Sequence, residues 1–295
     1  MGTLSRWLVG SGITAGVALG GAGPARAQHV ALPPTLVALD SDEGQRLLAE
    51  ASARRDFVPL AEAFVTQDNP GYCGVASAVT VLNALQVPAP EAPAWGAHVY
   101  TQENFFEGAA SGILAPGFKG GMTLRQLGDM IQCHPAGAEV VHASDTTLDA
   151  FRAAAAKNLA SPGDFVIVNY DRGALGQGTM MGHISPLGAY SEKADRFLVF
   201  DVARYKYPPV WVDAAALFGA MQTSDFVSGK SRGYVLVTAA AAPPGPSGAK
   251  PPRSPLQILA GIVLGAFLLG VLLGGTVQTV RVKRRFRRLA KAKDT

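Results

Sequence analysis

The chain changes character over the segment Gln67-Asp68-Asn69-Pro70-Gly71-Tyr72-Cys73-Gly74-Val75-Ala76, where turn-forming residues give way to an apolar run. This run continues to Leu85 and is ended by Pro88, so it predicts a buried helix that begins close to Cys73. A cysteine at a helix N-terminus lies at the positive end of the helix dipole, which favours its thiolate. Gly74 would leave room for a substrate backbone. We therefore expect a nucleophilic cysteine at the start of a core helix.

The rest of the domain combines helical patterns with strands. Ser41 and the acidic residues after it predict a helix over 42–50, and apolar spacing predicts another over 147–159. Strands are predicted over 165–170, 182–187, 196–201 and 233–237. A helical first half packed on an antiparallel sheet is an α+β arrangement.

Three further residues complete a candidate site with Cys73. His183 begins a predicted strand after a glycine-rich segment, and Asp201 ends the next strand. Cysteine, histidine and carboxylate can act as nucleophile, base and the group that orients the base. Gln67, six residues before Cys73, could donate its amide N–H to the oxygen of an attacked carbonyl.

The two ends of the chain have membrane-related patterns. The interpretation divides the chain into a signal peptide (1–27), a catalytic domain (28–238), an Ala/Pro/Gly-rich linker (239–255), a transmembrane helix (256–280) and a basic cytoplasmic tail (281–295). The positive flanks predict that the domain lies on the extracytoplasmic, periplasmic side of the membrane. Glycines at four-residue spacing in 256–280 would allow two such helices to pair, which makes a homodimer one expectation.

Charge argues against a nucleic-acid-binding domain. The net charge is +4, but the tail has eight Lys or Arg and one Asp, a local +7 that leaves 4 − 7 = −3 for the rest. A basic face able to contact phosphates would have to lie within the folded part. We therefore expect no nucleic-acid partner.

Cysteine content limits the structural chemistry. Cys73 and Cys133 are the only cysteines, too few for a disulfide framework or a cysteine-based zinc site. A single bridge between them stays open as an alternative, because an exported domain meets an oxidising compartment.

Several motifs resemble the phytochelatin synthase family. They are Gln-x5-Cys-Gly-Val-Ala-Ser with Val-Leu-Asn-Ala-Leu (67–85), Asp-Phe-x-Pro-Leu (56–60), Tyr-x-Arg (170–172), Gly-His-x-Ser-Pro (182–186) and Asp-Val-Ala-Arg-Tyr-Lys-Tyr-Pro-Pro-x-Trp-Val (201–212). The resemblance covers roughly residues 36–237.

The resemblance implies a papain-like fold and an acyl transfer from glutathione. Cys73 would attack the Cys–Gly bond, release glycine and hold a γ-glutamylcysteinyl thioester, with His183, Asp201 and Gln67 in the roles given above. Asp225 and Arg232 would bind the amino and carboxylate ends of the γ-glutamyl group, because the Arg fork suits a carboxylate. A more ordinary interpretation of these two residues is an exposed ion pair.

The chain departs from plant and yeast members, in which a cysteine-rich C-terminal region is associated with metal-stimulated synthesis. We expect no tightly bound cofactor and no metal site in the protein. Cd²⁺ or Zn²⁺ would arrive as glutathione thiolate complexes. Water is then expected to take the acyl group more often than a second glutathione does, so hydrolysis ranks above phytochelatin formation.

Two alternatives remain. A bacteriocin-processing type of cysteine peptidase has a similar Gln-x5-Cys-Gly-x-Ala motif, a Gly-His pair and a later Asp. The other alternative is a catalytically silent, membrane-tethered thiol- or metal-binding module.

Overall fold

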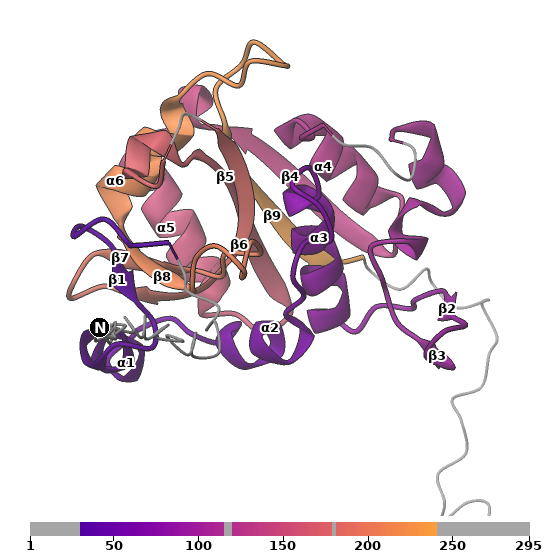
Figure 1. Ribbon diagram of the computed structural model, residues 1–295, viewed down its shortest axis with the longest axis horizontal. Coiled ribbons are helices and arrows are strands. Elements are labelled where there is room, and N and C mark those ends of the chain that lie inside the picture. The colour runs from indigo at the N-terminus through magenta and orange to yellow at the C-terminus, as the bar shows by residue number, and fades with distance from the viewer. Residues whose placement is uncertain (1–29, 115–119, 179–180, 241–295) are drawn as a thin grey trace, which may run out of the picture. The chain divides into compact units, whose positions relative to one another are not determined.

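The computed structural model describes residues 30–114, 120–178 and 181–240 (Figure 1). The predicted signal peptide, membrane helix and basic tail, and all but the first two residues of the predicted linker, lie outside these ranges. Within the ranges, none of the helices has the length and apolar content that a membrane crossing requires.

An antiparallel sheet forms the centre of the described part (Figure 1). Its seven strands lie in the order β1-β8-β7-β6-β5-β9-β4. Their bounds are β1 Val37–Ala38, β4 Ala136–His142, β5 Asp164–Asp171, β6 Gly182–Ser191, β7 Arg196–Val199, β8 Val210–Asp213 and β9 Gly233–Ala239. β5 and β6 are neighbours near the middle, and their register places Tyr170 opposite His183.

Helices cover both faces of this sheet. In β5 the side chains of Phe165 and Ile167 enter one core cluster, and those of Val166 and Val168 enter another, because successive residues of a strand point to opposite faces. The first face is covered by α1 Asp42–Ala49, α2 Phe57–Ala63, α3 Cys73–Ala84 and α4 Leu124–Gln132, and the second by α5 Leu148–Leu159 and α6 Ala214–Gln222. A strand that is apolar throughout is typical of a sheet covered on both sides.

Helix α3 is the central helix of the first face. Ten of its twelve residues, from Cys73 to Leu82, are buried, as expected for a helix that is apolar all round. It packs across β6 and β5, between α2 and α4. The buried helix predicted from the apolar run is therefore confirmed.

The other predicted helices and strands are present as α1, α5, β5, β6, β7 and β9. The prediction of a helical first half and a sheet in the second half is right only in part. β1 and β4 come from the first half and lie at the two edges of the sheet, while α5 and α6 come from later in the chain and cover its second face.

A smaller substructure follows α3. β2 Glu91–Ala92 and β3 Ala97–His98 form a two-stranded hairpin. Short 3-10 helices follow at η1 Asn104–Phe106 and η2 Gly108–Gly112, and two more occur at η3 Ala143–Asp145 and η4 Gly173–Leu175. The hairpin and η1 border a groove beside α3.

Candidate active site

Cys73 is the first residue of α3, and only 6% of its surface is exposed. Burial by itself would raise the pKa of the thiol. The hydrogen bond with His183, the positive charge of that imidazole and the backbone N–H groups of Ile184 and Gly74 act in the opposite direction and lower the pKa below its usual value. The helix N-terminus and the histidine therefore both favour the thiolate.

His183 is the second residue of β6, so the strand brings it from a distant part of the chain to the start of α3. Its Nε2 lies 2.9 Å from Oδ1 of Asp201, which leaves Nδ1 for the hydrogen bond with Cys73. Burial and the charge of Arg172 would lower the pKa of the imidazole, but the charge of Asp201 and the hydrogen bonds with Asp201 and Cys73 together raise the pKa. His183 thus lies between Cys73 and Asp201, and its interactions lower the pKa of the thiol while those of Asp201 raise the pKa of the imidazole.

Asp201 is fully buried and lies two residues beyond the end of β7, not at the end of the strand as predicted. Its Oδ1 accepts hydrogen bonds from His183 and from the backbone N–H of Ala203, at 2.9 Å each. Burial alone would raise the carboxyl pKa, but His183 and then Arg172 hold the pKa at about 2. Asp201 therefore stays ionised and fixes the orientation of the imidazole.

Gln67 lies in an irregular segment between α2 and α3 and is buried. Its backbone N–H donates to the carbonyl of Val202 at 3.0 Å, which ties it to the chain that carries Asp201. Its Nε2 donates to the carbonyl of Asn69 at 2.8 Å, and the hydroxyl of Tyr205 lies 3.4 Å from the same nitrogen. Its Oε1 is buried without a hydrogen-bond partner in the described structure.

Gly74 has a packing role that the sequence did not indicate. A Cβ atom at this position would lie 2.5 Å from Sδ of Met122 and 3.2 Å from Cδ1 of Ile184. The space expected for a substrate backbone is therefore filled by the protein's own side chains, and the glycine allows α3 to approach them closely.

Asp225 and Arg232 are close together and mostly buried, unlike an exposed surface pair. Arg232 Nη1 lies 3.8 Å from Oδ1 of Asp225, and Nη2 lies 3.8 Å from Oδ2 of Asp171. The guanidinium also packs on Gly182, where a Cβ atom would lie 2.5 Å from Nη1. Because Gly182 directly precedes His183, Arg232 belongs to the surroundings of the same site.

Comparison with known proteins shows the family of the chain. The family model for phytochelatin synthase matches residues 27–234. The chain belongs to the phytochelatin synthase family. It is 36% identical over 211 residues to glutathione gamma-glutamylcysteinyltransferase 1 of Triticum aestivum, which covers 70% of this chain and 41% of the wheat protein.

Further relatives are similar to a comparable degree. Glutathione gamma-glutamylcysteinyltransferase 1 of Arabidopsis thaliana is 34% identical over 208 residues, and glutathione gamma-glutamylcysteinyltransferase of Schizosaccharomyces pombe is 30% identical over 210 residues. Each match covers 70% of this chain, but only 42% and 50% of those proteins. The chain thus matches half or less of the length of these phytochelatin synthase relatives.

Three polar residues of the site were not predicted from the sequence. Arg172 is buried and its Nη2 lies 2.7 Å from both carboxylate oxygens of Asp201. Asn169, also buried, is paired with Ile184 in the sheet and has no partner for Oδ1 within the described residues. Asp171 faces Arg232. The Tyr170-x-Arg172 pattern included Arg172 among the family motifs, but it did not indicate which residue Arg172 contacts.

The other three histidines of the described residues and the second cysteine have structural contacts. His98, His134 and His142 each pair a ring nitrogen with a backbone carbonyl. Cys133 lies at the end of α4, and both cysteines are free thiols rather than a disulfide. Among the residues that the structure describes, no cluster of three or more His, Cys, Asp or Glu is arranged to hold a metal ion.

Proposed function

We propose that the protein cleaves the Cys–Gly peptide bond of glutathione through a γ-glutamylcysteinyl thioester on Cys73. One observation carries this proposal, namely the hydrogen-bonded series Cys73, His183 and Asp201 at the start of α3 in a chain of the phytochelatin synthase family. An imidazole that is oriented by an ionised carboxylate and paired with a thiol supports nucleophilic catalysis by the sulfur.

In the first half-reaction the thiolate of Cys73 attacks the carbonyl carbon of the cysteinyl residue, and a pair of electrons moves to the carbonyl oxygen. When the tetrahedral intermediate collapses, the C–N bond breaks and the His183 imidazolium gives its proton to the departing glycine amine. Gln67 donates to the oxyanion, where charge develops in the transition state, the side-chain N–H that makes only the long 3.4 Å contact with the Tyr205 hydroxyl. Glycine leaves and the thioester remains.

In the second half-reaction neutral His183 takes a proton from the attacking group as the thioester C–S bond breaks, and Cys73 returns to its thiolate. Attack by water gives γ-glutamylcysteine, whereas attack by the α-amino group of a second glutathione gives a longer peptide. We rank hydrolysis first and peptide transfer second. Cd²⁺ or Zn²⁺ enters as a thiolate complex of the substrate, because soft thiolate ligands suit these ions.

The γ-glutamyl end is assigned to the group around Arg232. Its guanidinium offers a fork to the α-carboxylate, and Asp225 and Asp171 attract the α-ammonium group. Asn169 Oδ1, a buried acceptor without a partner in the described structure, is available for a substrate N–H.

We also propose a papain-like fold for the domain and a membrane location for the protein. Cys73 on a helix that packs against the sheet carrying His183 suits a papain-like domain. The uncharged segment 256–280, followed by the basic tail, favours a single-pass anchor with the domain on the extracytoplasmic side.

The decisive experiment is mass spectrometry of the full-length protein incubated under reducing conditions with glutathione, with and without Cd²⁺, beside Cys73→Ser. We expect release of glycine and a γ-glutamylcysteinyl adduct on Cys73, both absent from the variant. Longer peptides would show transfer. If neither glycine nor adduct forms, the glutathione assignment is wrong, and cleavage of a leader peptide by the same cysteine would become the first alternative to test.

A further inference from the structure

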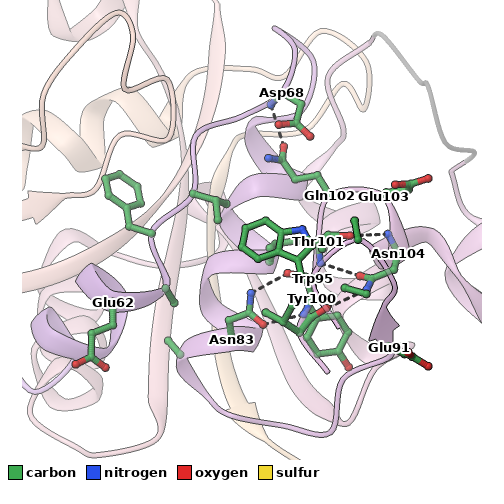
Figure 2. Close-up of a pocket in the computed structure, with 18 of the residues that line it drawn as sticks. Glu62, Asp68, Asn83, Glu91, Trp95, Tyr100, Thr101, Gln102, Glu103 and Asn104 are labelled. Atoms are coloured by element: carbon green, nitrogen blue, oxygen red, sulfur yellow. Dashed lines mark hydrogen bonds between the residues drawn. The ribbon is translucent and has the colours of Figure 1, made fainter. Parts of the chain in front are cut away.

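The groove beside α3 has a volume of about 1130 Å³, and Gln102 contributes to its wall (Figure 2). The side chain of Gln102 is buried and makes two hydrogen bonds with the backbone of residues 66–68. Its Nε2 donates to the carbonyl of Thr66 at 2.8 Å, and its Oε1 accepts from the N–H of Asp68 at 3.0 Å. These two contacts lie on either side of Gln67.

Residues 64–67 need such hydrogen bonds because they have no regular secondary structure. A chain outside helices and sheets must have its buried peptide groups satisfied by side chains or neighbouring loops. Gln67 itself donates its N–H to the carbonyl of Val202, so Thr66, Gln67 and Asp68 each have one backbone group in a hydrogen bond. The amide of Gln102 acts here like one residue of a neighbouring strand.

The segment that carries Gln102 is hydrogen-bonded to α3. Asn83, near the end of α3, donates to the carbonyl of Tyr100 and accepts from its N–H, both at 2.9 Å (Figure 2). Asn104 accepts from the N–H of Thr101 at 2.8 Å. One rigid helix therefore carries Cys73 at its first turn and fixes, through Asn83, Tyr100 and Gln102, the segment that holds Gln67.

We propose that Gln102 is a positioning residue that sets the carboxamide of Gln67 relative to Cys73. This inference rests on the proposed oxyanion role of Gln67. A donor helps only when it is aimed at the oxygen of the transition state, and small displacements are costly. Gln102 should therefore influence the rate of acyl transfer without touching the substrate.

The test measures glycine release from glutathione by the full-length protein and by Gln102→Ala, Gln67→Ala and the double variant. We expect Gln102→Ala to lower kcat about tenfold or more while KM changes less than about twofold, because the loss is confined to the transition state. The double variant should be no slower than Gln67→Ala alone. The pH dependence of Cys73 alkylation should not change, since the Cys73–His183 pair is left intact.

Two matched variants separate positioning from general stability. Gln102→Glu keeps the acceptor for Asp68 but loses the donor to Thr66, so its kcat should fall between those of the wild type and Gln102→Ala. Thr147→Ala removes the N-cap of α5, which accepts from Ala150 on the other face of the sheet, and should lower the melting temperature without lowering kcat.

The outcomes distinguish the two proposals. Multiplicative losses in the double variant, or unchanged kcat in both Gln102 variants while Gln67→Ala is slow, would overturn the role of Gln102 and leave that of Gln67 intact. Full activity in Gln67→Ala would overturn the oxyanion assignment, and the inference about Gln102 with it. If Gln102→Ala does not fold, the comparison of Gln102→Glu with its own double variant decides.

Discussion

Arg172 lies behind the triad, with Nη2 2.7 Å from both carboxylate oxygens of Asp201. Its Nη1 also donates to Oε1 of Gln177 at 3.2 Å, and the guanidinium lies 4.9 Å from the ring centroid of Tyr207. Arg172 thus compensates a fully buried negative charge that already supports His183.

Replacement of this arginine should therefore cost both stability and activity. We expect Arg172→Met to lower the free energy of unfolding by about 3 kcal/mol, because loss of one partner leaves a buried charge uncompensated. Urea unfolding at pH 7 measures this loss. Arg172→Lys keeps the positive charge but not the planar guanidinium with its several N–H donors, so it should lower the free energy of unfolding less than Arg172→Met does. A stable, fully active Arg172→Met variant would contradict this account of Asp201.

Ionisation of Cys73 can be followed by alkylation with iodoacetamide over a range of pH, with mass spectrometry to separate the two cysteines. The pKa of Cys73 is lowered by His183, so its alkylation should begin at lower pH than that of an ordinary thiol. Burial, and then the charge of Asp129, raise the pKa of Cys133, which should react only at higher pH.

The matched variant is His183→Ala. Without the imidazole, burial dominates and the alkylation midpoint of Cys73 should move above that of a free thiol. An unchanged midpoint in His183→Ala would show that the pair is not coupled in solution.

Recognition of the substrate carboxylate is tested at Arg232. Because Lys lacks the fork geometry, Arg232→Lys should raise KM for glutathione about tenfold or more, measured from initial rates of glycine release. Thr223→Val removes the hydrogen bond from Nε of Arg232, at 3.2 Å, and that from the Thr223 hydroxyl to the carbonyl of Ala220, at 2.7 Å, but leaves the guanidinium in place, so it should raise KM less. Equal KM values for Arg232→Lys and the wild type would remove Arg232 from the substrate site.

A buried carboxyl far from any assigned role predicts a pH-dependent stability. Burial, and then the charge of Asp164, raise the pKa of Asp56 to about 8, and its Oδ2 has no hydrogen-bond partner among the described residues. A carboxyl whose pKa is higher in the folded state stabilises that state fully below its unfolded pKa of about 4 and less as pH rises through 8.

Asp56→Asn should therefore match the wild type near pH 4 and be more stable at pH 9, by on the order of 5 kcal/mol in chemical unfolding. Asp164→Asn removes the charge that helps to raise the pKa of Asp56, so the loss of stability with rising pH should end at a lower pH and be smaller than in the wild type. If the two stability curves of Asp56→Asn and the wild type run parallel between pH 4 and pH 9, Asp56 does not titrate in that range.

Much of the fold and the centre of the site followed from local sequence patterns. The apolar run after Cys73 is longer than a typical strand and therefore predicted a buried helix, and the order of Cys73, His183 and Asp201 supplied three complementary side chains. The helices α2, α4 and α6 were not predicted, although Thr123 and Gln126 form a capping box at the start of α4. A capping box can be found in a sequence, but it involves only two residues and does not by itself predict a helix.

The sequence by itself determined which segments are buried and which residue types can perform acyl transfer, because periodicity and helix position depend on near neighbours along the chain. Only the tertiary structure decided which partners they meet. Arg172 contacts Asp201, which lies 29 residues away in the sequence, and Gln102 donates a hydrogen bond to Thr66, which lies 36 residues away. Such contacts depend on strand register and on the packing of α3 against the sheet, which no local pattern specifies.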